Sequence, residues 1–377
     1  MKGRRVWAVA RKESLHVIRD PRSLGMAVAI PMLMLFLFGF ALTLDVDRVP
    51  IVVYDQSASP ASRDFLSRFF GSRYFALRGF ISDYDALVRA IDRRDATAAL
   101  VIPYDFAPNV AASRGAGVQF IVDGSDSNTA TIVIGYADFV VSAYSRDVTL
   151  SALARSGLRP PCAPLDVRPR AWFNADLESK NYIVPGLIAV IMMVISALLT
   201  SLTVAREWER GTMEQLISTP VSPRELVLGK LIPYFVIGMV DVTLSILMGE
   251  FVYGVPLRGS VALLFAMAAV FLAGALSLGL LISVLSKTQL VANQLAMVLT
   301  FLPAFLLSGF VYPISNMPRA IRLVSYVVPA RYFVALLKGI YLKGVGMNVL
   351  AGEALLLALF GAVMVALANA ALKKKLA

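Results

Sequence analysis

The sequence predicts an α-helical integral membrane protein with six transmembrane helices and an inserted α/β domain outside the cytoplasm. Hydrophobic residues make up 58% of the chain and charged residues only 16%, whereas a soluble domain is about half apolar and a quarter charged. The mean hydropathy is +0.72. Six apolar runs are long enough to cross a bilayer core, which takes about 20 residues. A more polar stretch of about 135 residues separates the first two runs and is long enough to form a domain.

The six apolar runs occupy residues 24–44, 182–204, 226–253, 260–286, 289–312 and 350–372. The first run is too long for the apolar region of a cleaved signal peptide, and no small-residue cleavage site follows it. We therefore expect an interface helix at 1–23, a first span at 24–44, an outer domain at 45–181 and a five-helix membrane domain at 182–377. Small residues give the fourth run a stripe for close helix packing: Ala273, Ala275, Ser277 and Gly279.

The basic residues predict that both chain ends lie in the cytoplasm. Seven precede the first run: Lys2, Arg4, Arg5, Arg11, Lys12, Arg19 and Arg22. Three follow the last: Lys373, Lys374 and Lys375. Lysine and arginine concentrate on the cytoplasmic side of membrane proteins, and an even number of spans agrees with this orientation. The net charge of +11 also raises nucleic-acid binding as an alternative, but the same residues are explained by membrane orientation.

One basic stretch disagrees with this topology. Residues 315–346 would lie outside, yet they carry Arg319, Arg322, Arg331, Lys338 and Lys343. Moving the stretch inside requires an odd number of spans and expels a basic terminus. We therefore expect it to form short helices that dip into the outer leaflet.

The sequence predicts no catalytic residues and no metal ligands in this chain. The only cysteine is Cys162 and the only histidine is His16, which excludes an intrachain disulfide and a Cys/His metal cluster. A phosphate-binding loop of the common type is also absent, because Gly229-Lys230 lacks the upstream glycine and is followed by Leu231.

The insertion predicts a small α/β layer. Strands are expected at 51–54, 98–102 and 118–122, and helices are expected to begin at Ser59-Pro60 and within 82–85. A long helix is expected at 129–154, followed by a proline-rich linker at 159–164. Alternation of strands and helices indicates helices packed on a sheet.

Residues 4–20 predict an amphipathic helix lying along the membrane surface. At about 100° per residue, one side carries Val6, Trp7, Ala10, Ser14, Val17 and Ile18. The other side carries the charged residues, including Lys12, Glu13 and His16. Asp20-Pro21 ends the helix. The alternative is a charged anchor that only sets topology.

Residues 206–230 form a charged segment between two apolar runs and carry two candidate capping boxes. The first runs from Thr212 to Gln215, and Pro220 ends its helix. The second begins at Ser222, with Pro223 at the first helical position of the third span. Two boxes so close together predict a fixed shape and hence a docking surface. The alternative is a solvated charged loop.

Polar residues inside the apolar runs are candidate packing or transport residues. Asp241, in the middle of the third run, should face the bundle interior, either holding helices together or lining a path. Asn293 and Gln294 lie near the inner end of the fifth run, where they are expected to bond neighbouring helices. Lys230 is expected to extend its ammonium group to water.

Four stretches of the chain resemble a known family. They are ARKESLHVIRDPRSL, ATAALVIPYDF, REWERGTMEQLISTPVSPRELVLGK and SGFVYPISNMPRAIRLVSYVVPARYFVALLKGIYLKG. In this order they resemble the ABC type-2 exporter permeases, in the bacterial branch with a large periplasmic domain between spans one and two. The resemblance covers nearly the whole chain.

The resemblance implies a homodimer or heterodimer of permeases in the bacterial inner membrane, each docked on a separate cytoplasmic ATPase that holds ATP and Mg. The coupling segment, 205–225, would contain Glu207, Glu209, Arg210, Gly211, Thr212, Glu214, Gln215 and Pro220. The N-terminal contact would contain Lys12, Glu13, Arg19, Asp20 and Pro21. Outer re-entrant helices at 313–346 would contain Pro313, Met317, Pro318, Pro329, Arg331 and Tyr332. Some relatives also work with a periplasmic membrane-fusion adaptor.

The sequence therefore leaves three functions to consider for this chain. The first is the permease of an exporter for hydrophobic or amphipathic cargo such as drugs or lipids. The second is a scaffold or receptor of the same fold that binds a partner through its outer domain. The third, a membrane-embedded enzyme, is disfavoured because the sequence offers no nucleophile, metal cluster or carboxylate pair.

Overall fold

The computed structural model describes residues 3–42, 46–112, 114–155, 172–174 and 178–372. The chain forms two compact units, Leu44–Pro169 and the combination of Met1–Thr43 with Arg170–Ala377. Cys162 and the expected linker at 159–164 lie outside the described residues.

The inserted unit contains a four-stranded sheet of order β2-β1-β3-β4. Strands β1 (Val49–Asp55), β2 (Phe75–Phe80) and β3 (Ala98–Ile102) are parallel, and β4 (Gln119–Val122) is antiparallel to β3. Strand β2 was not expected, because its sequence FALRGF contains arginine and glycine and buries only Phe75. It can still pair because it lies at the edge of the sheet.

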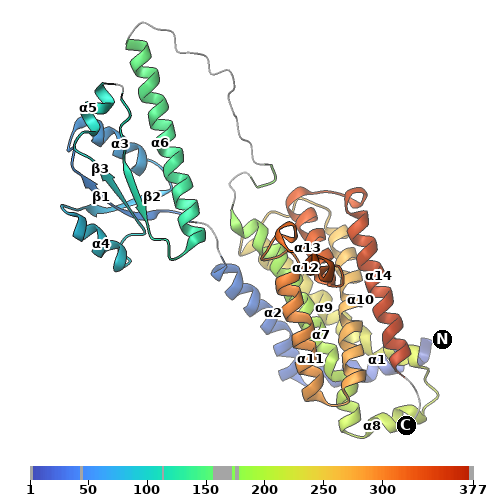
Figure 1. Cartoon of the computed structure of the whole chain (residues 1–377). Helices are drawn as coiled ribbons and strands as arrows, with labels where there is room; N and C mark the ends of the chain where they lie inside the picture. The colour runs from blue at the N-terminus through green and yellow to red at the C-terminus, as the bar shows by residue number, and fades with distance from the viewer. Residues whose placement is uncertain (1–2, 43–45, 113, 156–171, 175–177, 373–377) are drawn as a thin grey trace. The chain divides into compact units, whose positions relative to one another are not determined.

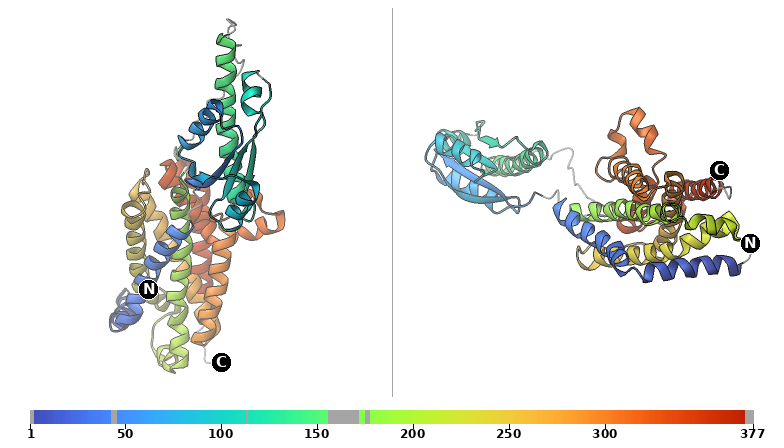
Figure 2. Two further views of the ribbon diagram at one scale, coloured as in Figure 1. Left: turned by 90° about the vertical axis from the view of Figure 1, so that its left-hand side faces the viewer. Right: turned by 90° about the horizontal axis from the view of Figure 1, so that it is seen from below.

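Helices cover both faces of this sheet. The connections supply α3 (Pro60–Phe70), α4 (Tyr84–Asp92), α5 (Phe106–Ala111) and the long α6 (Ser127–Arg155), visible in both views of Figure 2. One core joins alternate residues of β1 and β3 to α3 and α6, and a smaller core lies beneath α4. Ser59 caps α3 as expected, accepting from the Ser62 backbone at 3.0 Å. The expected α/β layer is confirmed.

The second unit is a helix bundle (Figure 1). Its elements are α1 (Gly3–Ile18), α2 (Pro21–Ala41), α7 (Ser179–Glu209), α8 (Thr212–Ser218), α9 (Pro223–Phe251), α10 (Val261–Ser286), α11 (Gln289–Leu307), η1 (Ile314–Asn316), α12 (Arg319–Ser325), α13 (Pro329–Lys338), η2 (Gly339–Lys343) and α14 (Met347–Ala371). In the described part of the chain, six helices are long and apolar enough to span a membrane. Their order confirms the predicted fold class.

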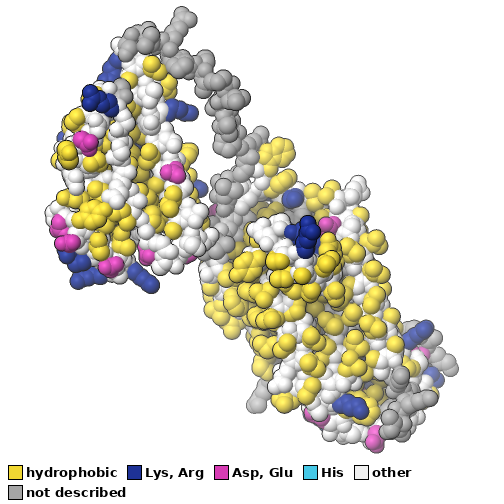
Figure 3. All heavy atoms as spheres, viewed as in Figure 1, with side chains coloured by type: hydrophobic (Ala, Val, Ile, Leu, Met, Phe, Trp, Pro, Cys, Tyr) yellow, Lys and Arg dark blue, Asp and Glu magenta, His cyan; other side chains and the backbone are white. Residues whose placement is uncertain are grey.

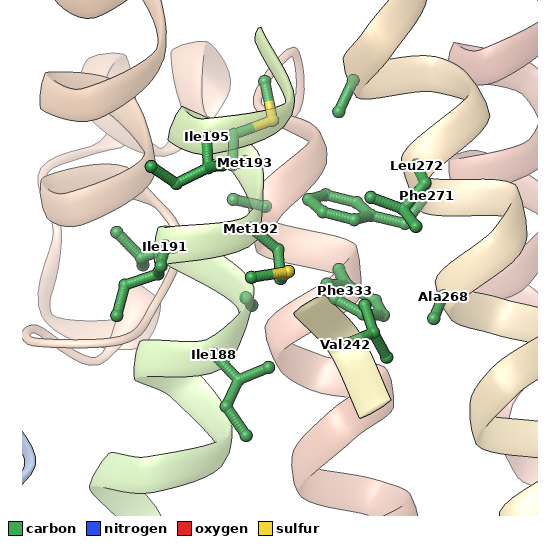
Figure 4. Packing of buried hydrophobic residues seen from close by; sticks show 14 of the residues in the cluster. Ile188, Ile191, Met192, Met193, Ile195, Val242, Ala268, Phe271, Leu272 and Phe333 are labelled. Atoms are coloured by element: carbon green, nitrogen blue, oxygen red, sulfur yellow. The ribbon is translucent and has the colours of Figure 1, made fainter. Parts of the chain in front are cut away.

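Helix α7 forms the centre of the bundle. Figure 4 shows Ile188 and Met192 of α7 directed toward Phe271 of α10 and Phe333 of α13. The two phenylalanine rings stack with centroids 4.1 Å apart. A Cβ atom at Gly279 of α10 would lie 2.2 Å from the Thr200 hydroxyl of α7. Glycine is therefore required for this helix contact, as the small-residue stripe predicts.

The outer surface of the bundle matches a membrane environment. Figure 3 shows hydrophobic side chains covering the middle of the bundle, with acidic and basic side chains toward its two ends. Only 22% of the apolar stretch is buried in each of α2, α11 and α14, compared with 89% in α7. Exposed apolar helices of this length are stable in lipid, so the chain is an integral membrane protein.

The basic stretch after α11 folds as a broken helix. Helix α12 meets α13 and its extension at a bend of 84°. The Arg322 guanidinium donates to the Ser315 carbonyl at 2.8 Å, and the Arg331 guanidinium lies 3.8 Å from the centre of the Tyr326 ring. The Lys338 ammonium group donates to the Gly309 carbonyl at 3.0 Å. Neutral partners inside the chain therefore hold these three cations.

The expected residues of this region take different positions. Pro329 is the first residue of α13 and is buried together with Met317 and Tyr332. The Tyr332 hydroxyl donates to the Tyr326 carbonyl at 2.7 Å. Pro313 and Pro318 are exposed and precede η1 and α12. Short helices therefore form where they were expected, and their role in closing a path stays a prediction.

Candidate functional site

Helix α1 packs against the beginning of α9 at the end of the bundle that carries α8 (Figure 1). The contact is close because Gly229 of α9 has no side chain. A Cβ atom there would lie 2.6 Å from Val9 Cβ and 3.0 Å from the Val6 carbonyl. Glycine therefore allows the backbones of α1 and α9 to approach each other.

The buried side of α1 differs from the predicted apolar side. Val9, Ala10 and Glu13 are buried, whereas Trp7 and Ile18 are 67% and 65% exposed. The assignment of Glu13 to the polar, solvent-facing side was wrong. Helix α1 turns its Glu13 side toward α9 because a basic partner lies there.

That partner is Lys230, which forms the centre of a cluster of four charges, of which Glu13, Glu207 and Lys230 are buried and Lys12 is exposed. Its Nζ donates to Glu13 Oε1 at 2.6 Å and forms an ion pair with Glu207 Oε2 at 2.9 Å. Lys12 Nζ donates to Glu207 Oε1 at 2.7 Å. Two cations and two carboxylates balance, as burial of charge requires. The cluster joins α1, the end of α7 and the beginning of α9.

The expectation that Lys230 extends to water was therefore wrong. Its side chain is 1% exposed. Glu13 and Glu207 are 5% and 7% exposed as residues. An extended lysine stem normally carries its charge out of an apolar region, but here two carboxylates are closer than the solvent.

The turn between α7 and α8 depends on Gly211. Its φ of 68° lies in the left-handed region, which glycine adopts without the steric cost of a Cβ atom. Gly211 precedes α8 directly, and Thr212 is the first helical residue. The predicted capping box from Thr212 to Gln215 was therefore wrong, because an N-cap residue needs extended backbone. The Thr212 hydroxyl instead donates to the Glu207 carbonyl at 3.4 Å.

The second predicted capping box is confirmed. Ser222 accepts from the Glu225 backbone at 3.4 Å, and Glu225 accepts from the Ser222 backbone at 3.0 Å. Arg5 of α1 donates to the Pro220 carbonyl and lies 3.9 Å from the Glu225 carboxylate. Helix α1 therefore contacts both ends of the turn that leads into α9.

The outer edge of this region is polar and exposed. Glu209 accepts hydrogen bonds from the backbone and the side chain of Gln289, which begins α11. Exposed residues of the expected coupling segment are Glu209, Arg210, Gly211, Glu214, Gln215 and Pro220. Glu207 is buried and Thr212 is half-buried. The segment therefore has a buried part around Glu207, which fixes it to the bundle, and an exposed part that includes Glu214 and Gln215.

The end of α1 leads directly into the first span. Arg19 is exposed, Asp20 is half-buried, and Pro21 is the first residue of α2. Arg206 donates to His16 Nε2 at 2.9 Å, which makes this nitrogen an acceptor, since a guanidinium can only donate. The short connection fixes α1 relative to α2 as well as α9.

The polar residues expected inside the spans, Asp241, Asn293 and Gln294, lie in different places. Asp241 is fully buried, as expected, but neither carboxylate oxygen has a hydrogen-bond partner among the described residues. Asn293 and Gln294 lie on the exposed side of α11. In the described part of this chain, neither contacts a neighbouring helix through a hydrogen bond. The expectation that they bond neighbouring helices stays a prediction.

Sequence reasoning missed the partners that complete the site, chiefly Lys230, Gln289 and the Arg5 contacts. These residues come from separate parts of the sequence, and a single sequence gives no signal that pairs them. Among the described residues, no group of three or more histidine, cysteine, aspartate or glutamate side chains is arranged to hold a metal. The site therefore consists of charged anchors and an exposed surface.

Comparisons with known proteins show the family of this chain. The model of the "ABC-2 family transporter protein" family matches residues 21–369. Similar proteins in Escherichia coli strain K12 include the "Probable multidrug ABC transporter permease YbhS", which is 40% identical over 90% of this chain and 89% of its own length. The "Probable multidrug ABC transporter permease YbhR" is 30% identical, with 92% of each chain covered.

A more distant relative from the same strain, the "Inner membrane transport permease YhhJ", is 27% identical over 80% of this chain and 78% of its own length. The family model covers the first span, the inserted unit and α7 through nearly all of α14, and it begins after α1. The predicted resemblance is thereby confirmed, and this chain belongs to the ABC-2 family of transporter proteins.

Proposed function

We propose that this chain is the transmembrane permease subunit of an ATP-binding-cassette exporter. It moves a hydrophobic or amphipathic cargo outward, using ATP that a separate subunit hydrolyses. The observation that carries the proposal is the buried cluster around Lys230, which joins α1 to α7 and α9. A force applied to α1 or α8 from below therefore reaches two membrane helices through fixed contacts.

The partner is a cytoplasmic ATPase that binds ATP and Mg, because the sequence of this chain has no phosphate loop. It docks on α1 and on the exposed residues of α8, including Glu214 and Gln215. ATP binding can change the permease only if the ATPase binds its two conformations with different affinities. The permease supplies the surface and the rigid connection, and the ATPase supplies the energy.

A second permease completes the assembly. Helix α11 exposes a continuous apolar side that also carries Asn293 and Gln294. Amide side chains in lipid are stabilised when they bond another helix, so this side fits a neighbouring permease. The two permeases enclose the cargo path, and a periplasmic membrane-fusion adaptor joins the outer side. Both termini face the cytoplasm of a bacterial cell, and the inserted unit lies in the periplasm.

Cysteine labelling tests the orientation. In a variant that carries Cys162→Ser, Ser125→Cys should react with a membrane-impermeant thiol reagent in intact spheroplasts. Ser218→Cys, in α8, should react only after the inner membrane is opened. Labelling of Ser218→Cys in intact spheroplasts contradicts the orientation.

Reconstitution tests the function. The chain and its ATPase are purified together and placed in proteoliposomes, and ATP hydrolysis is measured with a panel of amphipathic drugs and lipids. We expect at least one compound class to raise hydrolysis and to be transported. The alternative, a scaffold or receptor of the same fold, predicts a stable outer-domain partner with neither stimulation nor transport. That result would overturn the proposal.

A further inference from the structure

Two adjoining cavities lie between α1 and the membrane helices. The first has a volume of about 500 Å³ and is mostly apolar, with lining residues on α2 and α7 that include Ala27, Ile30, Leu198 and Leu199. The second has a volume of about 420 Å³ and lies among α1, the end of α7 and α8. Four residues line both cavities: His16, Thr203, Arg206 and Tyr234. The shared lining joins an apolar chamber to a polar one.

The polar cavity carries an excess of positive charge. Lys12, Arg206 and Arg210 line it together with Glu13 and Glu207. Both carboxylates are already bound by Lys230, whose ammonium group lies behind them. Three cations and two carboxylates therefore line the described part of the polar cavity.

Arg206 is the cation best placed for a ligand. It lies at the junction of the cavities, and its described partners are neutral, namely His16 Nε2 at 2.9 Å and Gln289 Oε1 at 3.4 Å. In the described part of the chain, it forms no ion pair with a carboxylate. A half-buried guanidinium without an anion is stabilised by a phosphate, which accepts two of its hydrogen bonds.

The apolar cavity indicates that the rest of the ligand is hydrophobic. Its wall is formed by aliphatic side chains of α2 and α7, and the exposed apolar surface of α2 continues from it. Among the described residues, Asp20 is the one carboxylate that lines it. With Asp20 included, the described lining of the joined cavities holds three cations and three carboxylates, and Glu13 and Glu207 are already paired with lysine. An acyl chain fits this chamber, whereas a free anion gains nothing from it.

We propose that the joined cavities bind an anionic amphiphile, with its phosphate at Arg206 and its acyl chain between α2 and α7. A bilayer phospholipid and an amphipathic cargo both offer this chemistry. In either case the ligand contacts α1, α2 and α7 at once, so it stabilises the contact between the interface helix and the spans. The inference does not depend on transport, because binding is a property of this chain.

Photolabelling tests the site in the full-length chain. The protein is placed in phosphatidylcholine nanodiscs that contain photoreactive phosphatidylglycerol, and labelled peptides are quantified. We expect labelling of α2 and α7 around Ala27 and Leu199. Arg206→Gln should lower it roughly tenfold, as loss of a charged hydrogen bond does. The matched control is Arg224→Gln, because Arg224 is exposed and lines neither cavity.

A second variant and three competitors complete the test. Leu199→Trp, which fills the apolar cavity, should lower labelling without removing any charge. If only unlabelled phosphatidylglycerol competes with the label, the ligand is a bilayer lipid. If dodecyl phosphate also competes, the site accepts single-chain amphiphiles too. Either pattern supports the proposal. Displacement by inorganic phosphate, equal labelling by a photoreactive phosphatidylcholine, or unchanged labelling in both variants would overturn it.

Discussion

Lys230 Nζ lies 2.6 Å from Glu13 Oε1, although 217 residues separate them in the sequence. The pair joins a surface helix to a membrane helix inside the protein, since Lys230 is 1% and Glu13 is 5% exposed. A buried ion pair contributes little net stability, but loss of one partner is costly because the other charge stays buried. The pair therefore fixes where α1 lies more than it increases the total stability.

Lys230→Met should destabilise the protein strongly. It leaves Glu13 without its hydrogen-bond partner and Glu207 without one of its two cations. Breaking a buried pair in this way costs about 3–5 kcal/mol. Thermal unfolding of the purified chain in detergent measures the effect. The control is Lys287→Met, which changes an exposed lysine in the turn before α11 and should leave the unfolding temperature nearly unchanged. If both substitutions lower the unfolding temperature equally, the charge cluster does not hold α1 in place.

Gly229→Ala should loosen α1 without altering any charge. The new Cβ atom would lie 2.6 Å from Val9 Cβ and 3.0 Å from the Val6 carbonyl, so α1 has to move away. Overpacking of this kind costs about 1–3 kcal/mol. Faster amide hydrogen exchange in α1 is the expected signature.

The matched control is Gly352→Ala in α14, where a Cβ atom meets nothing within 4 Å. There alanine should gain about 0.5–1 kcal/mol from its helix propensity. If both variants exchange like the wild type, the close approach of α1 to α9 is not needed to hold α1.

Much of the fold follows from the sequence, because spans and helix starts are encoded locally. The six apolar runs and the Ser222 capping box depend on neighbouring residues, and each appears as predicted. The Lys230 cluster and the exposed strand β2 depend on pairing between distant segments. Thr212 shows the opposite error, because a local motif was present but Gly211 supplied a different turn. The anchors of the site therefore could not be read from one sequence.

Asp241→Leu should leave the unfolding temperature unchanged or raise it. Both carboxylate oxygens lack a hydrogen-bond partner among the described residues, so the substitution removes a buried polar group that costs free energy. Thermal unfolding and transport are measured on the same preparation. A more stable variant that no longer transports assigns Asp241 to the cargo path, whereas a clear loss of stability contradicts the unpartnered arrangement.

Asp126 should make the start of α6 sensitive to acid. The Thr129 hydroxyl donates to its carboxylate at 2.6 Å, and this bond, with the backbone bonds of Thr129 and Asn128, lowers the pKa of Asp126. A lowered folded-state pKa stabilises the fold above the unfolded pKa, about 3.9. That stabilisation is lost as the pH falls through the folded pKa.

Amide exchange of the first turn of α6 measures this effect. Asp126→Asn should exchange faster than the wild type near neutral pH, and the difference should shrink below about pH 4. Asp138→Asn, an exposed change in the middle of α6, should not show this pH dependence. A difference between Asp126→Asn and wild type that persists unchanged in acid would mean that the carboxylate charge is not responsible.

The central claim is that α8 and α1 together form the ATPase docking surface, and Glu214→Lys tests it most directly. Glu214 is exposed on α8 and makes no ion pair within the described residues, so its reversal should spare the fold. The measurement is the amount of ATPase that co-purifies with the full-length chain. The control variant is Glu250→Lys, which changes an exposed glutamate at the opposite end of α9. We expect Glu214→Lys to lose most of the bound ATPase and Glu250→Lys to retain it. Equal retention by the two variants would show that α8 is not part of the docking surface.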